Sequence, residues 1–212
     1  MCRCSAWRPT TPTPTPKLAP TIDSKTLTIT KGFKDQIKIL NAGGARITYK
    51  SSNAKVAAVN SKGKVTAKKK GTATITVKTS TGFTIPCKVI VKDNVYTVRK
   101  VAVSALPAGS FGVNVYKMSY DKKGNLVLKA RMLNNRGYKA KYLKNFKITV
   151  KNGKGKKIGV YSAKKLTINL KSGKSKAYTF KIKKSKLKIK KTQDLRNSSY
   201  PKSTGKYYYT YR

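Results

Sequence analysis

Side chains that commonly do chemistry are scarce in this chain of 212 residues. Its five acidic residues are all aspartates, and it contains neither glutamate nor histidine. A catalytic base must titrate near working pH, and metal sites draw on histidine, carboxylates and cysteine clusters. We therefore expect a protein that is not an enzyme and that holds no metal and no cofactor. The aspartates are Asp23, Asp35, Asp93, Asp121 and Asp194.

Two candidate chemistries remain, and neither has a specific signal. A hydrolase without histidine would need a Ser–Lys dyad, but serine and lysine are abundant throughout the chain, so their proximity carries no information. The nearest calcium candidate is Asp121-Lys-Lys-Gly-Asn125. Calcium prefers several carboxylates, and lysines beside a single aspartate repel the ion. We expect this segment to form a hairpin turn instead.

The three cysteines give no disulfide framework, because their number is odd and their spacing is irregular. Cys2 and Cys4 are too close for a usual zinc knuckle and have no partner pair. Cys87 lies in the run 83–91, whose odd positions are all apolar. We therefore expect Cys87 to face a hydrophobic core and to be structural rather than reactive.

Positive charge is the strongest unusual feature of the sequence. The chain carries 50 lysine and arginine residues, which gives a formal net charge of +45. The run 181–191 holds seven lysines in eleven residues, and their alternation with apolar residues places them on the solvent face of a strand or its extension. Shorter clusters occupy 68–70 and 154–157. The candidate polyanion-binding residues are Lys68, Lys69, Lys70, Lys154, Lys156, Lys157, Lys181, Lys183, Lys184, Lys186, Lys188, Lys190 and Lys191.

Two interpretations of these lysines stay open. They form either a solvated face that keeps a sheet soluble and blunts edge pairing, or a surface that attracts an anionic polymer. Teichoic and lipoteichoic phosphates, acidic glycans and sulfated host glycans are the candidate polymers. Lysine acts as a mobile point charge, whereas arginine suits a defined bidentate site, so the composition favours diffuse attraction that depends steeply on salt. Non-specific nucleic-acid binding is the alternative, although no groove-binding helix, zinc knuckle or aromatic RNA-binding signature is visible.

The elements that must position these residues are short strands. Alternating Thr and Pro in residues 1–20 favour extended polyproline II, so we expect a disordered linker there. Period-two alternation then runs through 21–93 and resumes over 94–212, with turn signals such as Gly43-Gly44 and Asn152-Gly153 between the runs. No segment keeps a 3.6-residue period, so we expect no long helix.

Motifs in the first unit carry a family resemblance. Within 47–77 the chain reads YKSSN, then VAAV, GKVTA and GTATIT. In this order the motifs resemble the group 2 bacterial immunoglobulin-like domain, and the likeness extends over residues 21–92. The resemblance implies an immunoglobulin-like sandwich. These residues specify a fold, and none of them carries chemistry.

The second unit also shows family-like features. It reads LNN at 133–135, FKITV at 146–150 and LKSGKSKAYTF at 170–180. These motifs resemble the immunoglobulin-like accessory domains of Gram-positive surface proteins, which implies a second sandwich of about seven strands. The Tyr-rich segment 206–211 is either the last strand, which we favour, or a sticky aromatic end. The predicted fold class is therefore all-β, with two tandem immunoglobulin-like antiparallel β-sandwiches after a Thr/Pro-rich N-terminal linker.

The resemblance also bears on location. Group 2 domains look like modules of exported surface proteins, such as adhesins, wall-bound enzymes and phage tail proteins. We therefore expect an extracellular, cell-wall-associated and monomeric module for adhesion, display or attachment to anionic envelope polymers. The chain shows no signal peptide and no apolar run long enough to span a bilayer, which favours a fragment of a longer exported protein over a cytoplasmic one. A passive spacer is the remaining alternative. Many such domains are neutral or acidic, so no ligand is transferred from the family.

Overall fold

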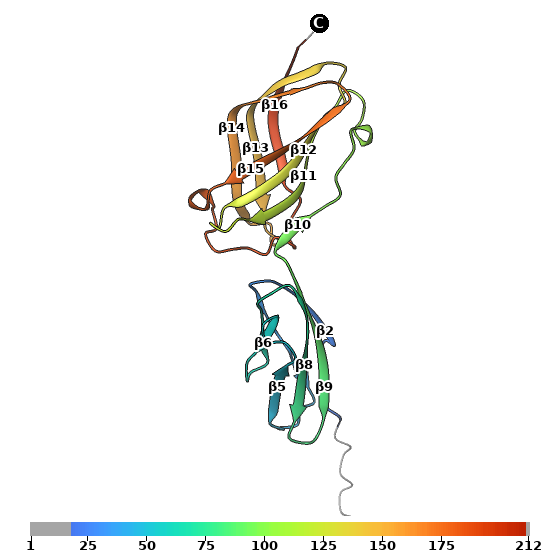
Figure 1. Cartoon of the computed structure of the whole chain (residues 1–212), viewed down its shortest axis with the longest axis vertical. Coiled ribbons are helices and arrows are strands. Elements are labelled where there is room, and N and C mark those ends of the chain that lie inside the picture. The colour runs from blue at the N-terminus through green and yellow to red at the C-terminus, as the bar shows by residue number, and fades with distance from the viewer. Residues whose placement is uncertain (1–17, 211–212) are drawn as a thin grey trace, which may run out of the picture.

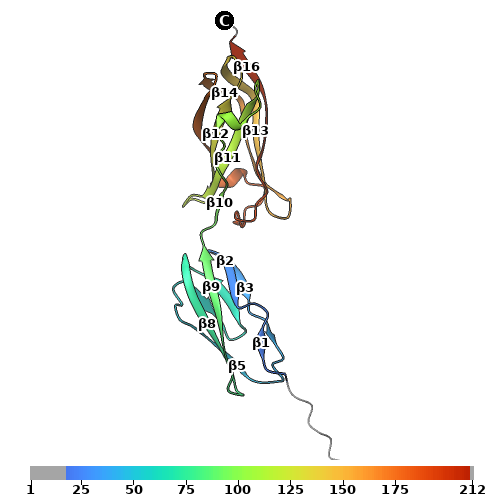
Figure 2. The same cartoon turned by 90° about the vertical axis from the view of Figure 1, so that its right-hand side faces the viewer.

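The computed structural model describes residues 18–210. They form two β-sandwiches, built from β1–β9 and from β10–β16, which follow one another along the long axis of the molecule (Figures 1 and 2). The predicted fold class of two tandem immunoglobulin-like β-sandwiches is confirmed. The predictions for Cys2, Cys4 and most of the Thr/Pro linker fall outside the described residues.

The N-terminal sandwich pairs a four-stranded sheet with a three-stranded sheet. The larger sheet has the order β2 (Thr26–Thr30), β9 (Thr84–Lys92), β8 (Gly71–Thr79) and β5 (Ile47–Ser51). The smaller sheet has the order β3 (Lys34–Gln36), β7 (Lys64–Ala67) and β6 (Ala57–Val59), and β1 (Thr21–Ile22) pairs with β4 (Ile39–Leu40).

One strand pair departs from the antiparallel expectation, because β2 and β9 run parallel. The other pairs of this sandwich are antiparallel. A parallel pair requires a long crossover connection. β2 lies near the start of the sandwich and β9 at its end, so the strands between them supply that connection.

Alternate residues of β8 and β9 fill the N-terminal core, as the period-two pattern predicts. Ile75, Val77, Cys87 and Val89 are fully buried. The prediction that Cys87 faces the core is therefore confirmed. Burial raises the pKa of the Cys87 thiol, with Asp23 and Asp35 adding to the rise. The thiol is thus held protonated, which opposes the thiolate form that a reactive cysteine needs.

Gly63 shows how the sequence fixes a hairpin in this sandwich. Its φ is +74°, and a Cβ at this position would lie 2.7 Å from atoms of the Tyr49 ring. The Asn60 side-chain oxygen accepts hydrogen bonds from the backbone N–H groups of Lys62 and Lys64. Glycine is required here for both backbone conformation and space, and it allows a tight turn between β6 and β7.

The C-terminal sandwich has the predicted seven strands. One sheet has the order β10 (Val95–Thr97), β11 (Phe111–Tyr120), β12 (Leu126–Asn134) and β15 (Lys174–Ile182). The facing sheet has the order β14 (Lys157–Leu170), β13 (Lys139–Lys151) and β16 (Lys202–Thr210). Two short 3-10 turns, η1 (Val103–Ala105) and η2 (Lys184–Lys186), complete it. The Tyr-rich end up to Thr210 is therefore a strand, as favoured from the sequence.

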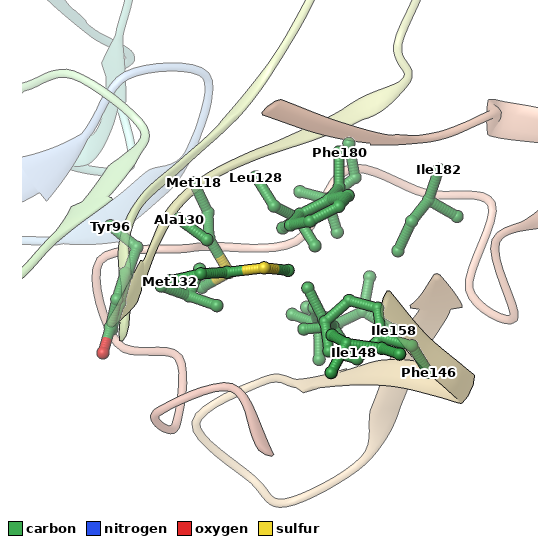
Figure 3. Packing of buried hydrophobic residues seen from close by; sticks show 14 of the residues in the cluster. Tyr96, Met118, Leu128, Ala130, Met132, Phe146, Ile148, Ile158, Phe180 and Ile182 are labelled. Carbon is green, nitrogen blue, oxygen red and sulfur yellow. The ribbon is translucent and has the colours of Figure 1, made fainter. Parts of the chain in front are cut away.

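The C-terminal core lies between these two sheets (Figure 3). Met118, Leu128 and Phe180 come from the four-stranded sheet, and Phe146 and Ile148 face them from β13. The rings of Phe146 and Phe180 lie with centroids 5.7 Å apart. The core residues of this sandwich and those of the N-terminal sandwich form two separate clusters.

β13 and β14 are longer than the sequence pattern indicates. The apolar runs 146–150 and 166–170 are only parts of strands of 13 and 14 residues. Both strands contain an asparagine with positive φ, Asn145 at 51° and Asn169 at 46°, next to shifts in the pairing register. Each bulge adds a residue that interrupts the period of two, so the pattern hides the continuity of the strand.

The lysine run 181–191 changes structure along its length. β15 ends at Ile182, and η2 follows at Lys184–Lys186, so the expected strand extension is a turn followed by irregular chain. The Lys184 backbone N–H donates to the side-chain oxygen of Asn125, and Leu187 inserts into the core at 3% exposure. These tertiary contacts end the strand, although the apolar alternation continues in the sequence.

Candidate polyanion-binding surface

The predicted lysine clusters are all exposed. Lys68, Lys69 and Lys70 connect β7 to β8, and Lys154, Lys156 and Lys157 lie at the β13–β14 hairpin. The remaining set begins on β15 and continues beyond η2. That last set consists of Lys181, Lys183, Lys184, Lys186, Lys188, Lys190 and Lys191.

The structure brings members of each cluster to the junction of the two sandwiches. On the N-terminal side, the Lys70 ammonium lies 3.9 Å from the Asp93 carboxylate, at the point where the chain leaves β9. On the C-terminal side, Lys154 and Lys191 line one open groove together with Phe33 of the N-terminal sandwich. Lys70, Lys154 and Lys191, which are far apart in the sequence, thus lie at the junction, and we call these three residues the junction belt.

Directed hydrogen bonds join the two sandwiches at this junction. Thr30 is 3% exposed, and its hydroxyl donates to the Asp194 carboxylate, whose two oxygens both lie 3.1 Å away. The same hydroxyl accepts a 3.2 Å hydrogen bond from the Arg196 guanidinium. The segment between β9 and β10 is held as well, because the Leu195 backbone N–H donates to the Asn94 side chain over 2.7 Å. These bonds restrict the relative orientation of the sandwiches and so hold the junction belt in place.

Asp121 occupies the β11–β12 turn, which confirms the predicted hairpin role of its segment. Its Oδ1 accepts the backbone N–H groups of Lys123 and Asn125, and its Oδ2 accepts the Asn125 side-chain amide and lies 3.3 Å from the Lys181 ammonium. The Asn125 hydrogen bonds and the nearby Lys181 lower the pKa of Asp121 to about 2. Both carboxylate oxygens of Asp121 are therefore engaged by the turn and by Lys181. Residues 18–210 contain no group of three or more His, Cys, Asp or Glu side chains that could hold a metal ion.

A second basic surface was missed by the sequence reasoning. On the sheet β14-β13-β16, Lys144 is paired with Lys165 on one side and with Lys206 on the other. In the neighbouring row, Tyr142 is paired with Tyr208, and their rings stack with centroids 4.7 Å apart. We call these five residues the lysine–tyrosine face. Only the strand register reveals it, because the three lysines are isolated from one another in the sequence.

A family comparison bears on the N-terminal sandwich. Residues 33–81 match the family described as the immunoglobulin-like domain of intimin. The match supports the prediction of a bacterial immunoglobulin-like domain in this part of the chain, and it covers less than half of the 212 residues. The group 2 assignment and the resemblance of the second unit stay predictions. No curated protein sequence matches the chain significantly.

Two solved structures are similar to this chain at low sequence identity. Domains 5–6 of the S-layer protein SbsC are 15% identical over 78% of this chain and 95% of theirs, with a TM-score of 0.28. Extracellular cadherin domains 3–6 of protocadherin gamma B2 are 15% identical over 90% of this chain and 46% of theirs, with a TM-score of 0.29. None of the helices among residues 18–210 is long and apolar enough to cross a membrane.

Proposed function

We propose that this chain is a non-catalytic module of a bacterial cell-surface protein that attaches to anionic envelope polymers through its lysines. The observation that carries the proposal is exposed positive charge without compensation. There are 50 basic residues for five aspartates, and the lysines of every predicted cluster are exposed. A polymer with many anionic groups would neutralise this charge and release counterions.

The few carboxylates of the chain cannot supply that neutralisation. Within the described residues, ion pairs join Lys70 to Asp93 and Lys181 to Asp121. The Asp194 carboxylate accepts the hydrogen bond of the Thr30 hydroxyl at the junction between the sandwiches. The match of residues 33–81 to an intimin domain supports a surface location. Wall association and a Gram-positive source are part of the proposal.

A pelleting experiment tests this function. The full chain is mixed with purified Gram-positive cell walls at about 20 mM salt, where charge screening is weak, and the pellet is then washed with rising NaCl. We expect binding at low salt and elution as salt rises, because each neutralised charge contributes to the salt dependence. Walls stripped of their phosphate polymers serve as the control and should retain little protein. Protein that stays in solution beside intact walls at low salt contradicts the proposal.

A passive spacer is the second candidate, and one observation favours it. The two sandwiches lie end to end (Figure 2), and hydrogen bonds between Thr30, Asp194 and Arg196 join them. Such an arrangement holds apart whatever lies at either end. A spacer needs no ligand, so the same pelleting experiment separates the two functions.

Nucleic acid is a competing partner rather than a third function. A chain with net charge +45 binds DNA in dilute buffer whatever its role. Binding to DNA and to a teichoic polymer must therefore be compared at about 150 mM salt, where weak non-specific attraction is reduced. Stronger retention on DNA would favour nucleic acid over the envelope.

A further inference from the structure

We propose that the lysine–tyrosine face is a binding site for a linear phosphodiester-linked polyol polymer, separate from the junction belt. Lys144, Lys165 and Lys206 occupy one cross-strand row of the sheet β14-β13-β16, and all three are exposed. The inference rests on the proposed function in one respect, because both assume an anionic polymer. It differs in placing the ligand on one defined surface.

The row is electrostatically unfavourable in the free protein. Directly opposed residues on neighbouring strands have Cβ atoms about 5 Å apart, and like charges in such pairs repel. Here two such pairs share Lys144. β13, β14 and β16 contain no acidic residue, so nothing in these strands offsets the repulsion. An anion placed between the ammonium groups removes this repulsion.

The two tyrosines hold the lysines in place. The Lys165 ammonium lies over the Tyr142 ring, 4.6 Å from its centroid, and the Lys144 ammonium lies 4.9 Å from the centroid of the Tyr208 ring. The rings are stacked on each other with an interplanar angle of 16°. Cation–π contacts of this kind restrict otherwise mobile side chains, so two of the three cations are arranged before a ligand arrives.

The same contacts decide which class of anion the face suits. Tyr208 on β16 covers Tyr142 from one side, and Lys165 on β14 approaches it from the other. Single-stranded nucleic acids bind by stacking bases on open aromatic faces, and here the Tyr142 ring is already engaged on both sides. What the face offers is ammonium and phenol donors. A polyol phosphate needs such donors and has no ring to stack.

Two matched variants of the full chain test the site. The face variant is K144Q/K165Q/K206Q, and the control is K129Q/K174Q/K176Q on β12 and β15 of the opposite sheet. Each removes three positive charges from exposed positions. Affinity for poly(glycerol phosphate) is measured by calorimetry at about 150 mM salt, with a sulfated glycan and an oligothymidylate of equal charge as further probes. We expect the face variant to lose at least about tenfold in affinity and the control to lose less than about threefold.

The outcomes separate this inference from the proposed function. Equal losses in both variants overturn the site and leave diffuse attachment standing. Absence of wild-type binding to any polymer at low salt overturns both. Tighter wild-type binding to the oligothymidylate or the sulfated glycan overturns the assigned ligand. Melting curves check that both variants are folded, and the polymer should raise the melting temperature of the wild type and the control more than that of the face variant.

Discussion

Replacing Phe146 by alanine should destabilise one half of this molecule and leave the stability of the other unchanged. Phe146 is 1% exposed and packs between the sheets of the C-terminal sandwich, against Phe180 and Tyr161. Its core cluster shares no residue with the N-terminal cluster. We propose that residues 21–93 and 94–212 are therefore two domains, each stabilised by its own core.

The expected size of the effect follows from the volume removed. Truncation of a buried phenylalanine to alanine costs about 3–5 kcal/mol, from lost burial and from the cavity left behind. For a domain of this size, 1 kcal/mol shifts the melting temperature by about 4 °C. The C-terminal melting transition should therefore fall by roughly 12–20 °C, while the N-terminal transition changes by no more than about 2 °C.

Calorimetry combined with hydrogen exchange measures this difference. Amides of β12 and β13 should exchange faster in the variant, and amides of β8 and β9 should keep their wild-type protection. Ile75→Ala provides the mirror experiment, because Ile75 is fully buried in the N-terminal core. Its cost of about 2–5 kcal/mol should appear only in the N-terminal transition.

One result would refute the reasoning. If either substitution lowers a single common transition, with exchange rising equally in both sandwiches, the junction couples them into one cooperative unit. The hydrogen bonds of Thr30 with Asp194 and Arg196 would then contribute far more than the roughly 1.5–3 kcal/mol expected of a bond to a charged group.

Two further predictions concern single contacts. Thr30→Val removes the hydroxyl that joins the sandwiches and should cost about 1–3 kcal/mol of stability. We expect it to broaden the interdomain distance distribution measured by small-angle scattering. Thr28→Val, on the exposed side of β2, is the control and should leave that distribution unchanged. The folded-state pKa of Asp121 is depressed to about 2, so its contribution is present above its ordinary value near 4 and is lost as pH falls through 2. The melting temperatures of wild type and Asp121→Asn should therefore differ most near neutral pH and converge below pH 2, and a constant difference would contradict the role given to this carboxylate.

Several features of the fold follow directly from local sequence. Cys87 could be placed in a core because the side chains of a strand alternate between two faces, and the odd positions of 83–91 are all apolar. The Asp121–Asn125 turn could be recognised from its own residues. The Asp121 side chain accepts the Asn125 backbone N–H, and Gly124 adopts the positive φ that the turn requires. These features can be predicted because they depend only on residues that are neighbours in the sequence.

Other features depend on contacts that local patterns do not contain. The strand β15 stops at Ile182 because Asn125, from another turn, accepts the Lys184 N–H. The parallel pairing of β2 with β9 joins the two ends of a domain. Bulges at Asn145 and Asn169 interrupt the period by which long strands are recognised.

The sequence by itself determined the all-β class, the buried cysteine and the excess of positive charge, because composition and alternation express these properties residue by residue. Tertiary structure alone decided where the charge gathers. Lys144, Lys165 and Lys206 become neighbours only when three strands pair in one register, and a shift of one residue would turn them to the other face. Register is fixed by the packing of two sheets around a shared core, which no stretch of the chain contains alone.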